Sequence, residues 1–327
     1  MRYDFHIRSA LARLDCANIL NLGEYRKEMN CPFCKSLTHI EHHAREMMFG
    51  LREKFTYLEC SGCGVLRLAT PPHNLSDYYP KGYYSFETAN GPVGKLKPFV
   101  LSLGRLKLRR LIHSVLPMPA VDLIYKLDMT PGMKILDVGG GNGKRVRDLR
   151  HAGFRRALCI DPFASQESAY CRKITLAEVE GTWDRIMFHH SFEHIEDQLG
   201  ALADVKKKLS PKGVCMIQVP VANWAWRHYG IDWVQLDAPR HMCIHTPASM
   251  RMAAQLAGLS VREVMHDSGA LQFWGSELYR RDIPLIEGQR NLSNYFDAST
   301  MKKYTAESKA LNASGEGDQA TFVMTAS

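Results

Sequence analysis

The stretch of this chain that most constrains its fold is residues 134–143, which read KILDVGGGNG. Its apolar start is typical of a buried parallel strand, and the glycines that follow are typical of a tight turn before a helix. Glycine has no Cβ, so the backbone of such a turn can approach a ligand closely. A second apolar run, residues 157–160, ends at Asp161, whose carboxylate can accept hydrogen bonds from both hydroxyls of a ribose. Together these features predict a nucleoside-binding site on an α/β sheet.

The glycine spacing distinguishes between the known kinds of nucleotide-binding turn. A dinucleotide-binding turn needs G-x-G-x-x-G, but the third glycine counted from Gly139 would fall at Lys144. A P-loop needs G-x-x-x-x-G-K-[ST], and the first and last positions of that motif do not match here. The spacing that fits is Asp-x-Gly-x-Gly-x-Gly, from Asp137 to Gly143. It resembles motif I of the class I S-adenosylmethionine-dependent methyltransferases. The alternative is a glycine-rich turn in another doubly wound protein.

The resemblance to class I methyltransferases implies both a fold and a cofactor site. The fold is an α/β, doubly wound, mostly parallel seven-stranded sheet of the Rossmann-like kind. In this family the glycine turn lies beside the methionine part of the cofactor, and the acid after the second strand holds its ribose. Carried over to this chain, the implied S-adenosylmethionine-binding residues are Asp137, Gly139, Gly141, Gly143, Asp161 and His189.

The alternation of apolar and helical segments along the chain also favours a parallel sheet with helices on both faces. The expected strands cover residues 134–138, 157–160, 174–176, 184–188, 214–219 and 260–265. A helix over residues 198–209 is expected to end at the Ser-Pro-Lys-Gly run that follows it. Residues 319–325 suit the last strand of the family, which inserts antiparallel between strands five and six. Ligands of such sheets bind beyond the carboxyl ends of the strands.

Histidines lie where the acceptor of a methyl group is expected. Residues 189–195, HHSFEHI, follow the fourth expected strand and resemble the family's H-x-x-E-H-I/L pattern, and residues 239–247 resemble its PRHL-x-x-F-T segment. If the acceptor atom is a hydroxyl oxygen or an acidic carbon, a base must take its proton, and histidine is best tuned for this at neutral pH. The candidate bases are His241 first, then His190 and His194, with Glu193 as an orienting partner. The alternative for each is a structural hydrogen-bonding role.

Three further residues are candidates for holding hydroxyls or phosphates of the acceptor: Tyr84, Asp232 and Arg240. Tyr84 belongs to residues 77–86, DYYPKGYYSF, which resemble the YYP…YYSY segment of a methyltransferase group found among polysaccharide- and sugar-modifying enzymes. Members of that group often carry an N-terminal zinc motif. The segment is either an aromatic lid over the cofactor or acceptor, or a packing surface between two domains.

Four of the nine cysteines form two C-x2-C pairs, Cys31 with Cys34 and Cys60 with Cys63. Each pair can direct two thiolates at one tetrahedral ion, so the spacing predicts a structural zinc ribbon. Thiols at all four positions leave no site open for water, so the ion is expected to hold the fold rather than do chemistry. The alternatives are disulfides or a redox pair. The start of the chain lacks the continuous apolar core of a secretory signal, which argues against disulfides.

The remaining sequence features only broadly limit the possible partners, location and domain organisation of the protein. Residues 95–113 contain Lys and Arg but no acid, and they predict a basic amphipathic helix. Its basic face is either solvated or in contact with a membrane surface or phosphates. The net charge of +8 permits an acidic partner but selects none. No apolar run approaches the roughly 20 residues that span a membrane, and the expected location is cytoplasmic. The expected units are residues 1–70 with the ribbon, 71–130 with the aromatic segment and basic linker, and 131–327 with the cofactor domain.

The sequence therefore predicts a zinc-containing, S-adenosylmethionine-dependent methyltransferase that acts on a small-molecule or glycan acceptor. A sugar or sugar-linked molecule, methylated at oxygen or carbon, is the favoured class. One rival is an RNA-base methyltransferase that holds RNA with the ribbon and the basic helix. The other is a non-enzymatic zinc-ribbon binding protein with a degenerate methyltransferase domain. The intact Asp137, Gly139, Gly141 and Asp161 argue against the second rival.

Overall fold

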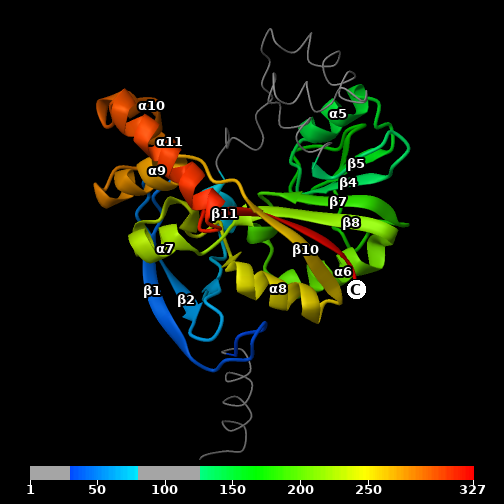
Figure 1. Cartoon of the computed structure of the whole chain (residues 1–327), viewed down its shortest axis with the longest axis horizontal. Helices are drawn as coiled ribbons and strands as arrows, with labels where there is room; N and C mark the ends of the chain where they lie inside the picture. Colours follow the sequence, from blue (N-terminus) through cyan, green and yellow to red (C-terminus); the bar gives the residue numbers. More distant parts are fainter. Residues whose placement is uncertain (1–29, 80–125) are drawn as a thin grey trace, which may run out of the picture.

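The computed structural model describes residues 30–79 and 126–327, which form two β-sheets lying side by side with helices around them (Figure 1). The strands of the larger sheet are β4 (Ile135–Val138), β5 (Ala157–Ile160), β6 (Cys171–Arg172), β7 (Trp183–His189), β8 (Leu209–Pro220), β10 (Leu259–His266) and β11 (Gln319–Ala326). Their order across the sheet is β10-β11-β8-β7-β4-β5-β6. The smaller sheet consists of β1 (His39–Arg45), β2 (Lys54–Cys60), β3 (Leu66–Leu68) and β9 (Cys243–Ile244), in that order.

Burial on both faces explains why β4 lies inside the larger sheet. All four of its residues are buried, and it pairs in parallel with β5 on one side and β7 on the other. Leu136 packs into the core formed with α6 (Gln198–Lys208) and α8 (Pro247–Leu256). Its neighbour Ile135 packs into a separate core formed with α5 (Lys144–His151). The sheet is thus covered on both faces, which confirms the predicted doubly wound fold.

The strand predicted to close the sheet is also confirmed. β11 pairs antiparallel with β8 on one side and with β10 on the other. All other described pairings in the larger sheet are parallel. Within the described ranges the sheet therefore has seven strands, and β11 is the one that runs opposite to the others.

Two of the predicted boundaries were wrong. The third strand is β6, not residues 174–176, because β6 is a two-residue edge strand held by its pairing with β5 through Cys159 and Cys171. The helix α6 ends at Lys208, and β8 begins at the next residue, so the Ser-Pro-Lys-Gly run lies within the strand. Those residues form a bulge, because Trp183 pairs with Leu209 but Arg185 pairs with Val214.

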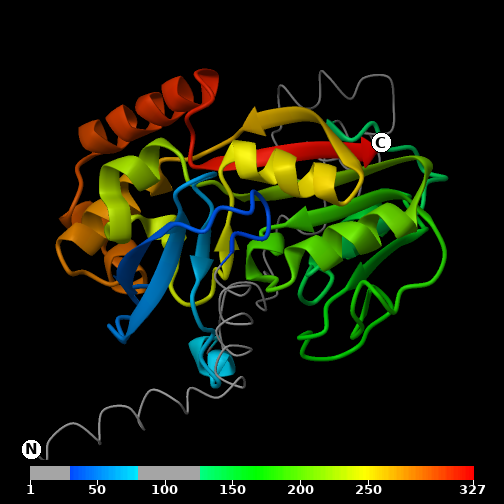
Figure 2. The ribbon, with the colours of Figure 1, turned by 90° about the horizontal axis from the view of Figure 1, so that it is seen from below.

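The smaller sheet joins segments that are far apart in the sequence. β3 pairs antiparallel with β9, with Leu66 opposite Ile244. Buried aromatic side chains, among them Tyr57, Trp226 and Trp233, fill the core beside this sheet. Four helices gather on the side of the molecule where β1 and β2 lie (Figures 1 and 2), namely α7 (Trp224–Tyr229), α9 (Leu271–Arg280), α10 (Leu285–Arg290) and α11 (Ala298–Ala313). A different core, which contains Cys31 and Cys60 together with Leu136 of β4, links the cysteine-rich segment to the larger sheet.

Some of the predicted features lie outside the described residues. These are Tyr84, the predicted basic helix over residues 95–113 and most of the aromatic segment. Within the ranges 30–79 and 126–327, no helix has both the length and the apolar character required to cross a membrane.

Candidate functional site

The glycine turn connects the end of β4 to the start of α5. Gly139, Gly141 and Gly143 have φ angles of 72°, 58° and 72°, in the left-handed region that favours glycine. A Cβ on Gly139 would lie 2.5 Å from the Cβ of Ser191, so the turn also packs closely against the loop that follows β7. Gly143 is the N-cap of α5. Three predicted cofactor-binding glycines thus lie in one turn, and none of these three positions carries a side chain of its own.

This packing makes Gly139 a sensitive position. We expect Gly139→Ala to destabilise the protein by about 1 kcal/mol through its positive φ and by a further 1–3 kcal/mol or so through the contact with Ser191. Gly181→Ala is the matched control, because Gly181 has a φ of 73° but, within the described part of the chain, no heavy atom within 4 Å of the point where a Cβ would lie. Unfolding in denaturant measures both variants. Equal losses for the two would contradict the close approach of the two loops.

The two predicted acids lie on either side of this turn. Asp161 accepts hydrogen bonds from the Gly141 N–H and the Phe163 N–H, both at 2.8 Å, so its carboxylate faces the turn. Each carboxylate oxygen has a further lone pair that can accept from a ribose hydroxyl. Asp137 is fully buried, with its Oδ1 3.2 Å from Nη1 of Arg145. Burial raises the pKa of Asp137, and the Arg145 guanidinium opposes this rise.

The loop after β7 brings histidines to the same edge of the sheet. Ser191 donates a 2.6 Å hydrogen bond to the carbonyl of Val138, which ties this loop to the glycine turn. His190 has a φ of 52°, a conformation that is strained for a non-glycine residue and is found preferentially at functional sites. Burial, and then the charge of Arg145, lowers the pKa of His189 to about 2, so its ring is neutral.

Four side chains at this edge form what we call the His–Glu cluster: His190, Glu193, His194 and His241. Glu193 is only 1% exposed, and its Oε1 lies 3.6 Å from Nδ1 of His190 and 3.9 Å from Nε2 of His241. The rings of His194 and His241 are 4.8 Å apart. Burial lowers the pKa of His241 despite the opposing charge of Asp237, so its imidazole is neutral at pH 7. The structure therefore brings together all four residues that the sequence analysis predicted as catalytic candidates.

Comparison with known proteins identifies the part of the chain that carries this geometry. Residues 107–264 match the model of a family described as a methyltransferase domain. Residues 107–264 thus carry an S-adenosylmethionine-dependent methyltransferase domain. The non-enzymatic alternative is thereby set aside. No curated protein matches the chain.

Several solved structures are similar to the methyltransferase domain. One is a chain from the complex between the Haloferax volcanii Trm112 methyltransferase activator and a methyltransferase, with 16% identity, 69% of this chain and 97% of that chain covered, and a TM-score of 0.44. Another, from Galdieria sulphuraria, is described as a sarcosine dimethylglycine methyltransferase, with 14% identity, coverage of 63% and 83%, and a TM-score of 0.40. A Geobacter sulfurreducens methyltransferase in complex with S-adenosylhomocysteine has 14% identity, coverage of 71% and 98%, and a TM-score of 0.37. Such low identities carry no information about the acceptor.

Two residues predicted to hold the acceptor have other partners within the methyltransferase domain and beside it. Arg240 is completely buried, and its Nη2 lies 2.6 Å from Oδ1 of Asp237 and 2.8 Å from Oε1 of Glu46. Its guanidinium is thus used to anchor the segment before His241, which corrects the prediction that it contacts the acceptor. Asp232 is half-buried, and burial raises its pKa against the opposing charges of Arg45 and Arg280. Its charged neighbours are therefore on β1 and α9 rather than in the His–Glu cluster.

The sequence prediction missed Glu46 and Asp237. Asp237 precedes Arg240 by three residues, and this short spacing was a usable signal for an ion pair. Glu46 contacts Arg240 across 194 residues of sequence, so nothing local could have indicated it. Glu46 also accepts hydrogen bonds from the N–H groups of Phe49 and Leu51. These contacts fix the position of the acid on which the anchor depends.

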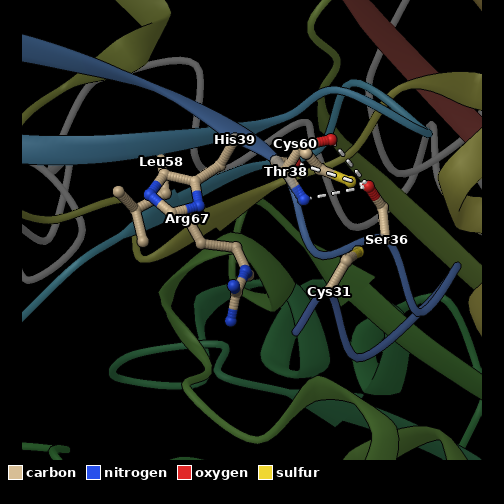
Figure 3. A pocket seen from close by; sticks show the side chains of 7 residues that line it. All are labelled: Cys31, Ser36, Thr38, His39, Leu58, Cys60 and Arg67. Carbon is tan, nitrogen blue, oxygen red and sulfur yellow. Dashed lines mark hydrogen bonds between the residues drawn. The ribbon is translucent and has the colours of Figure 1, made fainter. Parts of the chain in front are cut away.

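The four paired cysteines come together beside the methyltransferase domain. Their sulfur atoms all lie within 4.8 Å of one another, with Cys31 and Cys63 at 3.6 Å and Cys34 and Cys60 at 3.4 Å. These distances are too long for disulfides. They are close to the roughly 3.8 Å expected between thiolates around a tetrahedral zinc ion with Zn–S bonds of about 2.3 Å. Figure 3 shows two of these cysteines with the side chains of the adjoining pocket, Ser36, Thr38, His39, Leu58 and Arg67. The cluster is compatible with zinc.

Proposed function

We propose that this protein transfers the methyl group of S-adenosylmethionine to a hydroxyl oxygen or an acidic carbon of a small-molecule or glycan acceptor. A sugar or sugar-linked molecule is the favoured class. The observation that carries the proposal is the position of His190, which directly precedes Ser191, the residue in contact with the glycine turn. This position beside the glycine turn supports His190 as the proton acceptor of the proposed reaction. We further propose that the four paired cysteines hold a structural zinc ion.

The residues of this chain have separate roles in the proposed reaction. The backbone of residues 139–143 and the carboxylate of Asp161 bind the nucleoside part of the cofactor. When bound, S-adenosylmethionine supplies an electrophilic methyl group that is displaced in line from its sulfur. His190 takes the proton from the acceptor atom, whose freed electron pair forms the new bond to the methyl carbon. The electrons of the broken carbon–sulfur bond stay on sulfur.

His190 is better placed than His241 to meet the acceptor. Its side chain is 35% exposed, whereas that of His241 is 7% exposed. Its Nδ1 faces Glu193, which leaves Nε2 for the acceptor. The Nδ1 of His241 lies 2.8 Å from the carbonyl oxygen of Gln235, which holds that ring in place. We therefore assign proton removal to His190 and not to His241 or His194.

The aromatic segment supports a sugar-type acceptor. Oη of Tyr79 lies 3.2 Å from Nδ1 of His194, so the described beginning of this segment reaches the His–Glu cluster. Tyr84 follows five residues later in the sequence. The segment resembles one found in sugar-modifying methyltransferases, and aromatic side chains commonly provide the flat apolar surfaces of binding sites. We keep Tyr84 as a proposed acceptor contact on this basis.

We expect His190→Asn to lower the rate of methyl transfer about 100-fold, because general base catalysis contributes at least that much. Asparagine tolerates the positive φ at this position, so the fold of the loop is kept. The affinity for S-adenosylmethionine, measured by calorimetry, is expected to stay within about twofold of the wild-type value. His151→Gln, at an exposed position in α5, is the control and leaves both quantities unchanged. A full rate in His190→Asn would contradict the assignment.

The acceptor class is tested by transfer of tritiated methyl groups to mixtures of nucleotide sugars, lipids and RNA. Label in a sugar or sugar-linked molecule supports the proposal. Label in RNA, together with RNA affinity that falls steeply with salt, would replace it with the RNA-base alternative. Absence of S-adenosylmethionine binding by a protein with its zinc site intact would overturn the proposed function altogether.

A further inference from the structure

Glu193 is a buried carboxylate inside the His–Glu cluster. It lies in the short helix η4 (Phe192–His194) and is 1% exposed. Among the described residues, neither of its oxygens has a hydrogen-bond partner. The closest histidine nitrogens, at 3.6 Å and 3.9 Å, are beyond hydrogen-bonding distance. A buried ionised group without partners costs several kcal/mol, so buried charges are normally paired or bound to a metal ion.

The neighbouring cation does not supply the missing charge. Arg240, the buried guanidinium of the segment that leads to His241, is already paired with both Glu46 and Asp237. Among the described residues, the ion-pair contacts of the buried Glu193 are with histidines, and Arg240 is not among its partners. A cation bound beside Glu193 would give this carboxylate a partner that Arg240 does not provide.

Two histidines of the cluster, His194 and His241, are each oriented by a backbone carbonyl oxygen beside Nδ1. Nδ1 of His194 lies 2.8 Å from the carbonyl oxygen of Arg240, and Nδ1 of His241 lies 2.8 Å from that of Gln235. A carbonyl oxygen can only accept, so Nδ1 carries the proton in both rings and the lone pair is on Nε2. Metal-binding histidines are almost always oriented by such a bond from the other ring nitrogen. Glu193, His194 and His241 each offer a ligand atom within 4.8 Å of the other two.

We propose that Glu193, His194 and His241 bind a divalent transition-metal ion, at a site separate from the cysteine cluster. Two imidazoles and one carboxylate suit zinc, iron or manganese, and three protein ligands leave coordination positions open. An open position allows the ion to bind a hydroxyl oxygen of the acceptor and to lower its pKa, so that His190 removes the proton more easily. This catalytic role rests on the proposed function, whereas the existence of the site does not.

Cobalt(II) is a suitable probe, because its spectrum reports the ligands. Full-length protein with zinc already bound to its cysteines is titrated with cobalt chloride. We expect one further equivalent to bind, with weak ligand-field bands and no sulfur-to-cobalt charge-transfer band. Glu193→Gln is expected to weaken this binding at least tenfold. His43→Gln, which removes an exposed imidazole on β1, serves as the control and is expected to have no effect.

A stability measurement separates a metal ligand from a structural residue. Without cobalt, Glu193→Gln is expected to melt within a few degrees of the wild-type temperature, because glutamine has nearly the same size and shape as glutamate. With cobalt, only the wild-type protein and His43→Gln are expected to gain stability. No cobalt binding beyond the cysteine site, or binding that Glu193→Gln leaves intact, would overturn the proposal. Cobalt binding in a protein that fails to bind S-adenosylmethionine would keep the metal site and overturn the proposed function instead.

Discussion

Replacing Asp161 with alanine is expected to weaken the binding of S-adenosylmethionine by roughly 100-fold to 10,000-fold. The carboxylate is fixed on the glycine turn by the N–H groups of Gly141 and Phe163, which leaves its remaining lone pairs for the two ribose hydroxyls. A hydrogen bond to a charged group contributes about 1.5–3 kcal/mol, and each 1.4 kcal/mol or so is a factor of ten in affinity. Two such bonds give the expected range. Calorimetry measures the loss directly.

The control for Asp161→Ala comes from the same loop. Glu167 is exposed, and its Oε1 accepts a hydrogen bond from the N–H of Lys173, which lies outside the glycine turn. We expect Glu167→Gln to bind S-adenosylmethionine as the wild type does. Asp161→Asn keeps one acceptor oxygen and is expected to lie between the wild type and alanine. Affinity within about threefold of wild type in Asp161→Ala would mean that this acid does not hold the ribose.

Removal of the metal from the cysteine cluster is expected to cause the largest loss of stability. Structural zinc sites contribute about 10–16 kcal/mol of apparent binding free energy, so Cys63→Ser is expected to cost at least about 5 kcal/mol. Cys31, Cys60 and Cys63 belong to the same buried core as residues of α6 and α8. The hydroxyl of Thr246 also donates to the carbonyl of Cys63 at 2.9 Å. Loss of the ion should therefore loosen β9 and the nearby His241 as well.

Cys215→Ala is the matched control for the zinc prediction, because it removes a fully buried thiol of β8 that is not in the cluster. Its expected cost is about 1–2 kcal/mol. Zinc content and unfolding in denaturant are measured together for both variants. Methyl transfer is expected to fall with zinc content in Cys63→Ser but not in Cys215→Ala. A chelator that removes zinc and leaves both stability and activity unchanged would contradict a structural role for the ion.

The parts of the fold that could be predicted are those specified by local sequence. The glycine turn and β4 were recognisable because an apolar strand must be followed by a bare turn if the backbone is to approach a ligand. β6 was missed because a two-residue edge strand depends on its partner, and Cys159 rather than any local pattern sets its position. The Pro–Gly run after α6 was misinterpreted as a turn because its pairing with β7, through a bulge, comes from the rest of the sheet.

In the candidate site too, residues specified by local sequence could be predicted and residues that depend on distant partners could not. His190, Glu193 and His194 could be nominated because they directly follow a predicted strand, at the edge where ligands of such sheets bind. Arg240 was misassigned because its exposure could not be known from the sequence. A basic residue in a Pro-Arg-His segment suggests a phosphate contact, but its partner Glu46 lies in the cysteine-rich part of the chain. Long-range ion pairs of this kind become visible only when both segments are placed in space.

The most direct test of the cofactor site is a crystal structure of the protein grown with S-adenosylhomocysteine, which is inert to transfer. We expect the adenosyl group over residues 139–143, with both ribose hydroxyls within hydrogen-bonding distance of the Asp161 carboxylate. Density for the nucleoside at another place, or a carboxylate at position 161 that is directed away from the ribose, would contradict the cofactor site on which the proposed function depends.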